Sequence, residues 1–370
     1  MRLLLGLVVG ALAGCASQGP GVVKAKPLMI AHRGASALAP EHTLASYERA
    51  ILAGADYVEP DLVSSKDGVL LARHENEISG TTDVADHPEF ANRKATKQID
   101  GVPVTGWFTE DFTLAELKTL RARERIPANR PENVAQNGQY PIPTLTEVIA
   151  TVRRYEKIQG RRIGIYPETK HPSYFRSIGL PLEEPLVKTL HEAGYTKRND
   201  PILIQSFEVA NLKQLRKMTD LSLVQLINNP LNKPAANGTP QNTPYDFIAS
   251  GDKRTYADLT TAEGLREIAR YADGVGPYKE IIIPRTADNR LGQPTRFVQD
   301  AHAAGLKVHI WTLRPENPFL PVELRKGNAG SLTERGDAQA EIVAYLKTGI
   351  DGFFSDDPVV GRQAIEQFTR

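Results

Sequence analysis

DYVEPDLVSSKDGVLLARH, residues 56–74, is the stretch that predicts most about this chain. Two apolar runs flank Asp67-Gly68, and an Asp-Gly pair between such runs predicts a tight β-hairpin. A two-residue turn at that pair would place Asp61 opposite His74, with Glu59 one same-face step away. Two carboxylates and an imidazole are therefore expected to meet. Taken alone, these residues also fit an edge hairpin with a solvated acidic face.

An amphipathic helix, a glycine and a short apolar strand follow one another repeatedly along the rest of the chain. Glycine just past a helix end supplies the left-handed conformation that closes the helix. Strands that alternate with helices at this spacing indicate a parallel sheet. The predicted helices that end at such a glycine are Leu44–Ala53, Pro185–Ala193, Pro294–Ala304 and Ala338–Thr348.

Eight strands are predicted besides the hairpin return at Val69–Ala72. They predict an α/β fold, a (β/α)8 TIM barrel over residues 28–370, with its active site at the carboxyl ends of the strands. An open doubly wound sheet is the alternative, but no glycine-rich nucleotide-binding motif follows the first strand. The predicted strands are Leu28–Ala31, Tyr57–Leu62, Ile163–Tyr166, Ile202–Gln205, Leu223–Ile227, Gly274–Val275, Lys307–Trp311 and Gly352–Phe354.

Two segments are longer than ordinary connections. Residues of about 75–140 form an insertion after the second-strand hairpin, and the capping box Thr113–Glu116 predicts a helix within it. A second capping box, Thr144–Glu147, predicts the start of the helix that returns to the barrel. Residues 228–259, rich in Asn, Pro and Gly, predict a long loop at the barrel mouth. Insertions of this kind usually narrow or cover a site.

The composition is that of an ordinary globular chain, with 41% hydrophobic and 24% charged residues among 370. Lys and Arg number 45 and Asp and Glu 44, which leaves a net charge of +1. This balance, without any basic run, predicts no nucleic-acid partner. Cys15 is the only cysteine, so the fold must hold by packing without an internal disulfide.

The first residues indicate export. The apolar run Leu3–Ala13 is too short to span a bilayer but suits a secretion signal. It closes at Leu12-Ala13-Gly14-Cys15, which resembles the bacterial lipoprotein cleavage box. Residues 1–15 are therefore predicted to be a lipoprotein-type signal peptide and residues 16–27 a tether. The protein would be periplasmic and bound to a membrane, more readily the outer one, through a lipid on Cys15. A plain cleaved signal is the alternative.

Charged and polar side chains gather where the predicted strands end. Carboxylates suit Mg²⁺ or Ca²⁺ rather than Zn²⁺, while Arg and Lys suit a phosphate. Two histidines suit paired acid and base catalysis near neutral pH. The cluster therefore points to metal-assisted cleavage of a phosphodiester. Its members are His32 and Arg33 after the first strand, Glu59, Asp61 and His74 in the hairpin, Glu168 and Lys170 after the third strand, Gln205 and Trp311.

Motifs of other hydrolases are missing: the sequence has no Gly-x-Ser-x-Gly, His-Glu-x-x-His or phosphate-binding Gly-Lys-Ser motif. What is present resembles the bacterial periplasmic glycerophosphodiester phosphodiesterases, in the family's order from about residue 28 to the C-terminus. The motifs that carry the resemblance are His32-Arg33-Gly34, Pro40-Glu41-His42-Thr43, Glu59-Pro60-Asp61, Lys66-Asp67-Gly68, His74, Thr82-Asp83-Val84-Ala85-Asp86, Ile163-Gly-Ile-Tyr-Pro-Glu168 and Asp351-Gly-Phe-Phe-Ser-Asp356.

The resemblance implies a TIM barrel that binds one divalent cation, Ca²⁺ or Mg²⁺. It implies hydrolysis of a small-molecule glycerophosphodiester, such as glycerophosphocholine or glycerophosphoethanolamine, to glycerol 3-phosphate and an alcohol. The expected role would be phosphate or glycerol scavenging and lipid turnover. Position by position, it implies an acid/base pair His32 and His74, metal ligands Glu59, Asp61 and Glu168, and phosphate-contacting cations Arg33 and Lys170.

Several nearby residues are open to a structural interpretation. Gln205 and Trp311 are candidate substrate-binding residues that also fit a packing role. Glu41 is predicted to help start the first helix rather than to act in the site. His309, between two apolar residues of a strand, is predicted to be interior. Many family members have Asp where this chain has Glu75, which leaves the role of Glu75 open.

Two other functions compete with this prediction. The chain could be a surface lipoprotein that binds a phosphorylated ligand or a protein on an inactive barrel. It could also be an enzyme of a related barrel class that cleaves whole phospholipids. The complete cluster of carboxylates and histidines argues against the first, and the family resemblance argues against the second.

Overall fold

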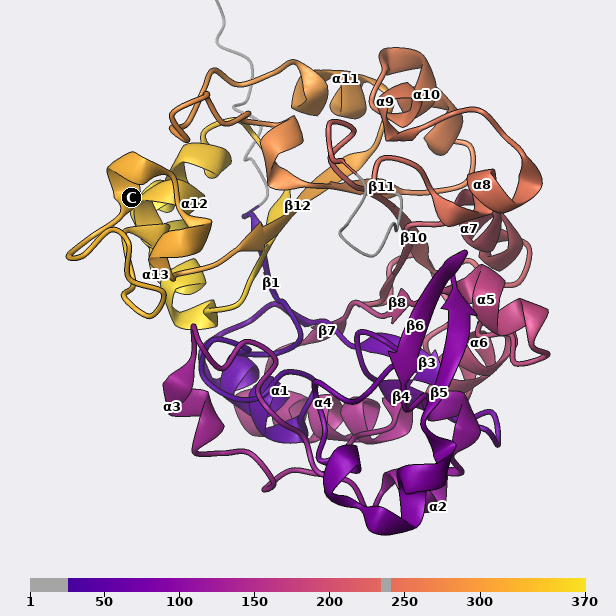
Figure 1. The fold of residues 1–370 in the computed structure, drawn as a ribbon. Coiled ribbons are helices and arrows are strands. Elements are labelled where there is room, and N and C mark those ends of the chain that lie inside the picture. The colour runs from indigo at the N-terminus through magenta and orange to yellow at the C-terminus, as the bar shows by residue number, and fades with distance from the viewer. Residues whose placement is uncertain (1–25, 234–240) are drawn as a thin grey trace, which may run out of the picture.

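The computed structural model describes residues 26–233 and 241–370, which form a barrel of strands ringed by helices (Figure 1). The strand order is β4-β3-β8-β9-β10-β11-β12-β13-β1-β2-β7, and every neighbouring pair is parallel except β3 with β4. The strands are β1 Leu28–Ala31, β2 Tyr57–Val58, β3 Asp61–Ser64, β4 Leu70–Ala72, β7 Gly164–Ile165, β8 Glu168–Thr169, β9 Leu203–Ser206, β10 Ser222–Ile227, β11 Gly274–Pro277, β12 Lys307–Leu313 and β13 Gly352–Ser355.

Two of the barrel strands are each interrupted at a proline. β2 and β3 are separated by Glu59 and Pro60, and β7 and β8 by Tyr166 and Pro167. β2 pairs with β7, and β3 pairs with β8, so the interrupted strand β2–β3 lies beside the interrupted strand β7–β8. These two pairings join the two ends of the strand order and close the barrel. β4 is the hairpin return. The eight predicted strands are therefore all present, and the predicted TIM-barrel fold is confirmed.

Helices surround the sheet (Figure 1). The four predicted helices are present, and the glycine after each takes a positive φ at Gly54, Gly194, Gly305 and Gly349. The helices are α1 Leu44–Leu52, α2 Leu114–Leu117, α3 Pro131–Val134, α4 Leu145–Gln159, α5 Pro172–Ser177, α6 Glu183–Glu192, α7 Val209–Arg216, α8 Tyr245–Ser250, α9 Tyr256–Leu259, α10 Ala262–Ile268, α11 Phe297–Ala303, α12 Ala338–Leu346 and α13 Pro358–Thr369.

The hairpin at Asp67-Gly68 is present, but its predicted register was wrong by one residue. Its strands pair so that Arg73 rather than His74 lies opposite Asp61, and the Arg73 N–H donates to the Asp61 carbonyl. The loop consists of residues 66–68, and Gly68 takes a φ of 78°. A left-handed glycine at the third position is typical of three-residue hairpin loops, which shift the pairing relative to a two-residue turn.

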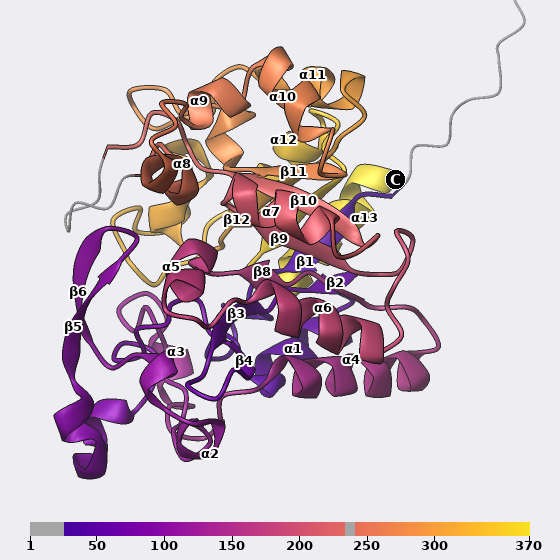
Figure 2. The ribbon, with the colours of Figure 1, turned by 90° about the vertical axis from the view of Figure 1, so that its right-hand side faces the viewer.

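The insertion of residues 75–140 is more elaborate than predicted. Both predicted capping boxes are confirmed, at the starts of α2 and α4. The insertion also contains a two-stranded hairpin, β5 Ala95–Ile99 and β6 Val102–Gly106, and the short helix α3. In Figure 2 this hairpin and α8 lie on the same side of the barrel. The β5–β6 hairpin therefore stands at the end of the barrel where α8 lies.

Residues 228–259 were predicted to be a loop, and the prediction was wrong for their second half. The described part contains α8 and α9. Helix α9 begins with a capping box, in which the Thr255 hydroxyl accepts from the helix backbone and Asp258 accepts from the Thr255 N–H. Sequence patterns rarely separate helices of four to six residues from loops, because so short a segment shows little periodicity.

The barrel interior is packed with apolar and aromatic side chains. One buried cluster contains Ile30, Tyr166, Val224 and Phe354, which come from four different strand positions. His309 is buried and its Nδ1 lies 2.9 Å from the Tyr166 hydroxyl, so the predicted interior position of His309 is confirmed. Among the described residues, none of the helices has the length and apolar character to cross a membrane. The predicted signal peptide lies outside the described residues.

Candidate active site

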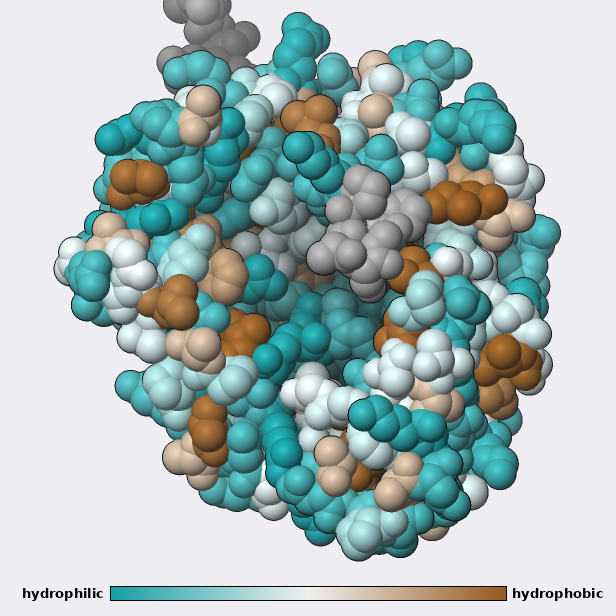
Figure 3. All heavy atoms as spheres, in the orientation of Figure 1, coloured by the Kyte–Doolittle hydropathy of each residue, from teal (hydrophilic) through white to brown (hydrophobic). Residues whose placement is uncertain are grey.

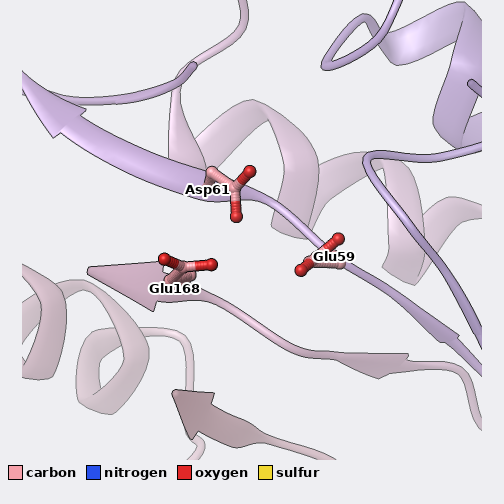
Figure 4. Close-up of side chains that lie close together, drawn as sticks. All are labelled: Glu59, Asp61 and Glu168. Atoms are coloured by element: carbon pink, nitrogen blue, oxygen red, sulfur yellow. The ribbon is translucent and has the colours of Figure 1, made fainter. Parts of the chain in front are cut away.

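Three carboxylates from two adjacent strand positions meet inside the barrel mouth (Figure 4). Asp61 on β3 pairs in register with Glu168 on β8, and Glu168 pairs in register with Gln205 on β9. Glu59 precedes Asp61 by two residues, which is the spacing of one strand face. One oxygen from each of the three carboxylates lies within 4.8 Å of one oxygen from the others. The sheet register therefore gathers the three predicted metal ligands.

The electrostatics of this cluster fit a divalent cation. Burial, followed by the charges of Asp61 and Glu168, raises the pKa of Glu59 well above its usual range. Burial also raises the pKa of Glu168 to about 7, although Lys170 opposes this shift. The buried Oδ1 of Asp61 has no hydrogen-bond partner within the protein. Buried carboxylates with an unpartnered oxygen are the donor set that Ca²⁺ and Mg²⁺ take in proteins.

His42 contacts the carboxylate cluster through Asp61, a role that the sequence analysis did not predict. Its Nε2 lies 3.0 Å from Asp61 Oδ2, and its Nδ1 lies 2.8 Å from the Tyr47 hydroxyl. Burial alone would raise the pKa of Asp61, but the charge and hydrogen bond of His42 hold it well below its usual range. His42 thus fixes the orientation of one candidate metal ligand. The signal was its place in the Pro40–Thr43 motif.

Arg33 projects from a tight turn that follows β1. Arg33 and Gly34 both have positive φ, 59° and 86°. A Cβ on Gly34 would lie 2.7 Å from the backbone carbonyl carbon of Ser46, so only glycine fits this approach. The Arg33 N–H donates to Glu59 Oε2 at 3.0 Å, and its Nε lies 3.5 Å from Asp61. The turn therefore brings the guanidinium beside the carboxylate cluster.

Glu41 was predicted to help start the first helix, and this was wrong. Thr43 caps α1 through its side chain, and no acidic residue lies in the first turn. The Glu41 carboxylate instead accepts from Arg33 Nη1 at 2.9 Å and from Arg125 Nη2 at 2.6 Å. A buried carboxylate is satisfied by such cations rather than by a helix end. Glu41 therefore holds Arg33 in position.

His32 is fixed by a carboxylate from the last strand. Its Nδ1 lies 2.6 Å from Asp356 Oδ1, and its Nε2 lies 4.0 Å from Glu59 Oε2. Because an ionised carboxylate only accepts hydrogen bonds, Nδ1 carries the proton and Nε2 is an acceptor that faces the cluster, with the Thr312 hydroxyl 3.5 Å away. Burial, followed by the charge of Arg33, lowers the pKa of His32 to about 4.

His74 is fixed in the same way by the next residue. Its Nδ1 lies 2.5 Å from Glu75 Oε1, and its Nε2 lies 3.2 Å from Lys170 Nζ. Lys170 also donates to Glu168 Oε1 at 2.7 Å. Burial, followed by the charge of Arg33, lowers the pKa of His74 to about 3. The role left open for Glu75 is therefore to orient His74.

A cavity of about 80 Å³ lies among these groups. Its lining includes both predicted acid/base histidines, Arg33, Glu59, Glu168, Gln205 and Trp311. A larger cavity of about 470 Å³ shares His74, Glu168 and Trp311 with it and reaches Asp100 of the insertion and Tyr245 of α8. Figure 3 shows this face hollowed at its centre, with hydrophilic surface inside the hollow.

Gln205 and Trp311 both line the small cavity, and each also makes a hydrogen bond to the surrounding protein. Gln205 Nε2 donates to Glu59 Oε1 at 2.8 Å, and its buried Oε1 has no partner within the protein. The Trp311 indole donates to the Gly276 carbonyl at 2.7 Å, and its ring packs edge-on against Phe207. Gln205 therefore orients one carboxylate, while Trp311 forms part of the wall that both cavities share.

A model of the glycerophosphoryl diester phosphodiesterase family matches residues 32–360 of this sequence. The chain belongs to this family. Both the resemblance seen in the motifs and the assignment as an enzyme are confirmed. The chain is a phosphodiesterase that acts on glycerophosphodiesters.

Two curated relatives match most of this phosphodiesterase. Glycerophosphodiester phosphodiesterase GDPD6 of Arabidopsis thaliana is 37% identical over 344 residues, 90% of this chain and 84% of the relative. A glycerophosphodiester phosphodiesterase of Haemophilus influenzae is 30% identical over 376 residues, 96% of this chain and 95% of the relative.

Solved structures share the fold of this phosphodiesterase. A phosphodiesterase of Oleispira antarctica has a TM-score of 0.57 at 20% identity and covers 92% of this chain and 97% of its own. A glycerophosphodiester phosphodiesterase of Agrobacterium tumefaciens has a TM-score of 0.53 at 16% identity, with 90% and 98% covered. At these identities the agreement concerns the architecture alone.

Asp356 is a site residue of this phosphodiesterase to which the sequence analysis gave no role. It follows β13, the last strand, and β13 pairs in parallel with β1, with Ser355 beside Ala31. His32 follows β1 as Asp356 follows β13. Since parallel neighbours end at the same edge of a sheet, that register places the two side chains next to each other. Barrel closure, applied to the last strand, could have found this pair.

Proposed function

We propose that this phosphodiesterase hydrolyses glycerophosphodiesters to glycerol 3-phosphate and an alcohol by means of His32 and His74, with one divalent cation. The observation that carries the proposal is the shared geometry of the two histidines. Each has its Nδ1 fixed on a carboxylate, and both line the same small cavity as two of the clustered carboxylates. Two oriented imidazoles beside one anion site suit an acid and a base.

Glu59, Asp61 and Glu168 would hold the cation. When bound, it would neutralise phosphate charge as a Lewis acid. Arg33 and Lys170 would bind the remaining phosphoryl oxygens, since guanidinium and ammonium groups lie beside the carboxylates on two sides. One imidazole, in its neutral form, would accept a proton from the attacking oxygen at its Nε2, and the other, in its protonated form, would donate a proton to the leaving alkoxide. The attacker would be water or the glycerol 2-hydroxyl.

The substrate class is supported by the product complex of a relative. The phosphodiesterase of Oleispira antarctica was solved with the product sn-glycerol-3-phosphate, and its fold matches this chain at a TM-score of 0.57. The larger cavity beside His74 offers room for the departing alcohol. A glycerophosphodiester with a small head group, such as choline or ethanolamine, would fit this pair of adjoining cavities, which share lining residues.

An assay of the full-length protein on glycerophosphocholine tests this function. Glycerol 3-phosphate release is expected with Ca²⁺ or Mg²⁺, to be lost in EDTA, and to return when the ion is added back after the chelator is removed. Absence of turnover with either ion would favour a protein that binds phosphorylated ligands without cleaving them. Faster cleavage of phosphatidylcholine or phosphatidylinositol than of glycerophosphocholine would instead favour a phospholipase.

The same proposal includes an anchored, periplasmic location. Cys15 at the end of the Leu12–Cys15 box would carry the lipid. Cys15→Ser is expected to move the protein from the membrane fraction to the soluble periplasmic fraction, because a serine cannot receive the thioether-linked lipid. Fractionation followed by immunodetection measures this shift. A variant that stays in the membrane fraction would contradict the anchor.

A further inference from the structure

Two arginines of the insertion contact the two histidine–carboxylate pairs, which are His74–Glu75 and His32–Asp356. Arg125 and Arg130 both lie in residues 75–140, five positions apart and just before α3. Arg125 contacts Glu75, the carboxylate that holds His74. Arg130 contacts Asp356, the carboxylate that holds His32. One short segment outside the barrel strands therefore reaches both sides of the site.

Arg125 completes a chain of ion pairs that ends at His74. Its Nη2 donates to Glu75 Oε2 at 2.6 Å, while Glu75 Oε1 lies 2.5 Å from His74 Nδ1. The same guanidinium donates to Glu41 from Nε at 2.8 Å. Burial alone would raise the pKa of Glu75, but the charges of His74 and Arg125 hold it well below its usual range. Glu75 therefore stays an ionised acceptor.

Arg130 plays the corresponding part for His32. Its Nη2 donates to Asp356 Oδ2 at 2.5 Å, while Asp356 Oδ1 lies 2.6 Å from His32 Nδ1. Its Nε donates to Glu316 at 2.7 Å, and its Nη1 donates to the Ser36 carbonyl at 2.9 Å. The guanidinium is buried and held by three partners. Its orientation, and with it that of Asp356, is fixed.

We infer that Arg125 and Arg130 are positioning residues for the reaction, each acting through one carboxylate on one histidine. A buried carboxylate that lost its arginine would take up a proton or turn away, because an unpaired charge is costly in a low-dielectric site. The imidazole would then lose the acceptor that fixes its Nδ1–H tautomer and aims Nε2 at the cavity. The insertion thus completes the acid/base machinery as well as narrowing the mouth.

This inference rests on the two-histidine mechanism proposed above. A purely structural role is the alternative, in which the arginines only attach the insertion to the barrel. Such a role would reduce folding and substrate binding without a specific link between arginine and carboxylate. A positioning role instead lowers kcat, and most of the loss disappears when the carboxylate that holds the histidine is already gone. Double-mutant cycles separate the two, since residues that act through one another are not additive.

The test compares R125Q, E75Q and the double variant with R130Q, D356N and their double variant, in saturating divalent cation and glycerophosphocholine. Each arginine variant is expected to lose about 10- to 100-fold in kcat, the range seen when the partner of an orienting side chain is removed. R125Q should slow E75Q, and R130Q should slow D356N, by much less than each arginine change slows the parent. The small remaining loss reflects the second carboxylate that each arginine holds, Glu41 for Arg125 and Glu316 for Arg130. The cross combination R125Q/D356N should multiply the two single losses. R125K and R130K should recover part of the rate.

R123Q is the matched control. Arg123 lies two positions from Arg125 in the same segment, but it pairs with Asp86 on the surface and contacts neither histidine–carboxylate pair. It should keep normal kcat, and thermal unfolding should show all variants folded. Normal kcat in R125Q and R130Q, or losses that multiply within the R125Q/E75Q and R130Q/D356N pairs, would overturn the inference.

H32A and H74A are assayed beside these variants. Inactive histidine variants together with fully active R125Q and R130Q would overturn the inference while leaving the proposed mechanism intact. Active histidine variants would refute the mechanism, and the inference with it.

Discussion

His32→Ala and His74→Ala are each expected to lower kcat by at least about 10²-fold without unfolding the protein. Each imidazole lines the small cavity while its Nδ1 is held by a carboxylate. Alanine removes the proton donor or acceptor and leaves the metal ligands untouched. The measurement is kcat on glycerophosphocholine in saturating divalent cation.

The loss should appear in kcat more than in KM. Both histidines would act on the attacking and leaving oxygens, whose bonds change in the chemical step. Binding of the phosphate would instead depend on Arg33, Lys170 and the cation. His302→Ala is a suitable control, since His302 is exposed and pairs with Asp351 away from the site. A near-normal rate in either histidine variant would remove that residue from the acid/base pair.

Glu168→Gln is expected to weaken binding of the divalent cation by at least about 10-fold, an effect as large as is seen for residues that merely support a metal ligand. The amide keeps the shape of the side chain but removes one of three negative charges that share a small volume. The metal-free variant should unfold at a temperature no lower than the parent. Burial already raises the pKa of Glu168 to about 7, so its charge stabilises the metal-free fold little.

Isothermal titration with Ca²⁺ and Mg²⁺ and thermal unfolding without metal measure the two effects separately. Glu183→Gln is the matched control, because Glu183 is a buried carboxylate that pairs with Asn211 and Arg176 rather than with the cluster. Its metal titration should be unchanged. An unaltered titration in Glu168→Gln would show that this carboxylate is not a metal ligand.

The barrel and its carboxylate cluster could be predicted because both follow from local patterns. Glycine after a helix, apolar runs and polar strand ends are visible within a few residues, and strand register then carries Asp61 beside Glu168. The hairpin register was missed because Asp67-Gly68 suits two turn lengths. The three-residue form is selected in part by the Ser65 hydroxyl, which accepts from the Val69 N–H.

The supporting residues were harder to predict because they come from distant segments. Arg125 and Arg130 lie in an insertion whose sequence has no period that would place them on a strand end. Glu41 was predicted to start a helix because that role could be judged from neighbouring residues. Its actual contact with Arg125 joins positions that are far apart in the chain. Such ion pairs depend on how the insertion packs on the barrel, and a single sequence contains no direct signal of that packing.

Pro60 and Pro167 interrupt neighbouring strands immediately before Asp61 and Glu168. A proline has no N–H, so each of these positions is joined to the next strand through its carbonyl alone. The Pro60 carbonyl accepts from the Glu168 N–H, and the Pro167 carbonyl accepts from the Gln205 N–H. Fewer backbone hydrogen bonds therefore oppose a small movement of the neighbouring carboxylates at these two positions. A bound divalent cation would then set part of the spacing of these oxygens. A rim of this kind would suit either the longer oxygen bonds of Ca²⁺, about 2.3–2.6 Å, or the shorter ones of Mg²⁺, about 2.0–2.1 Å.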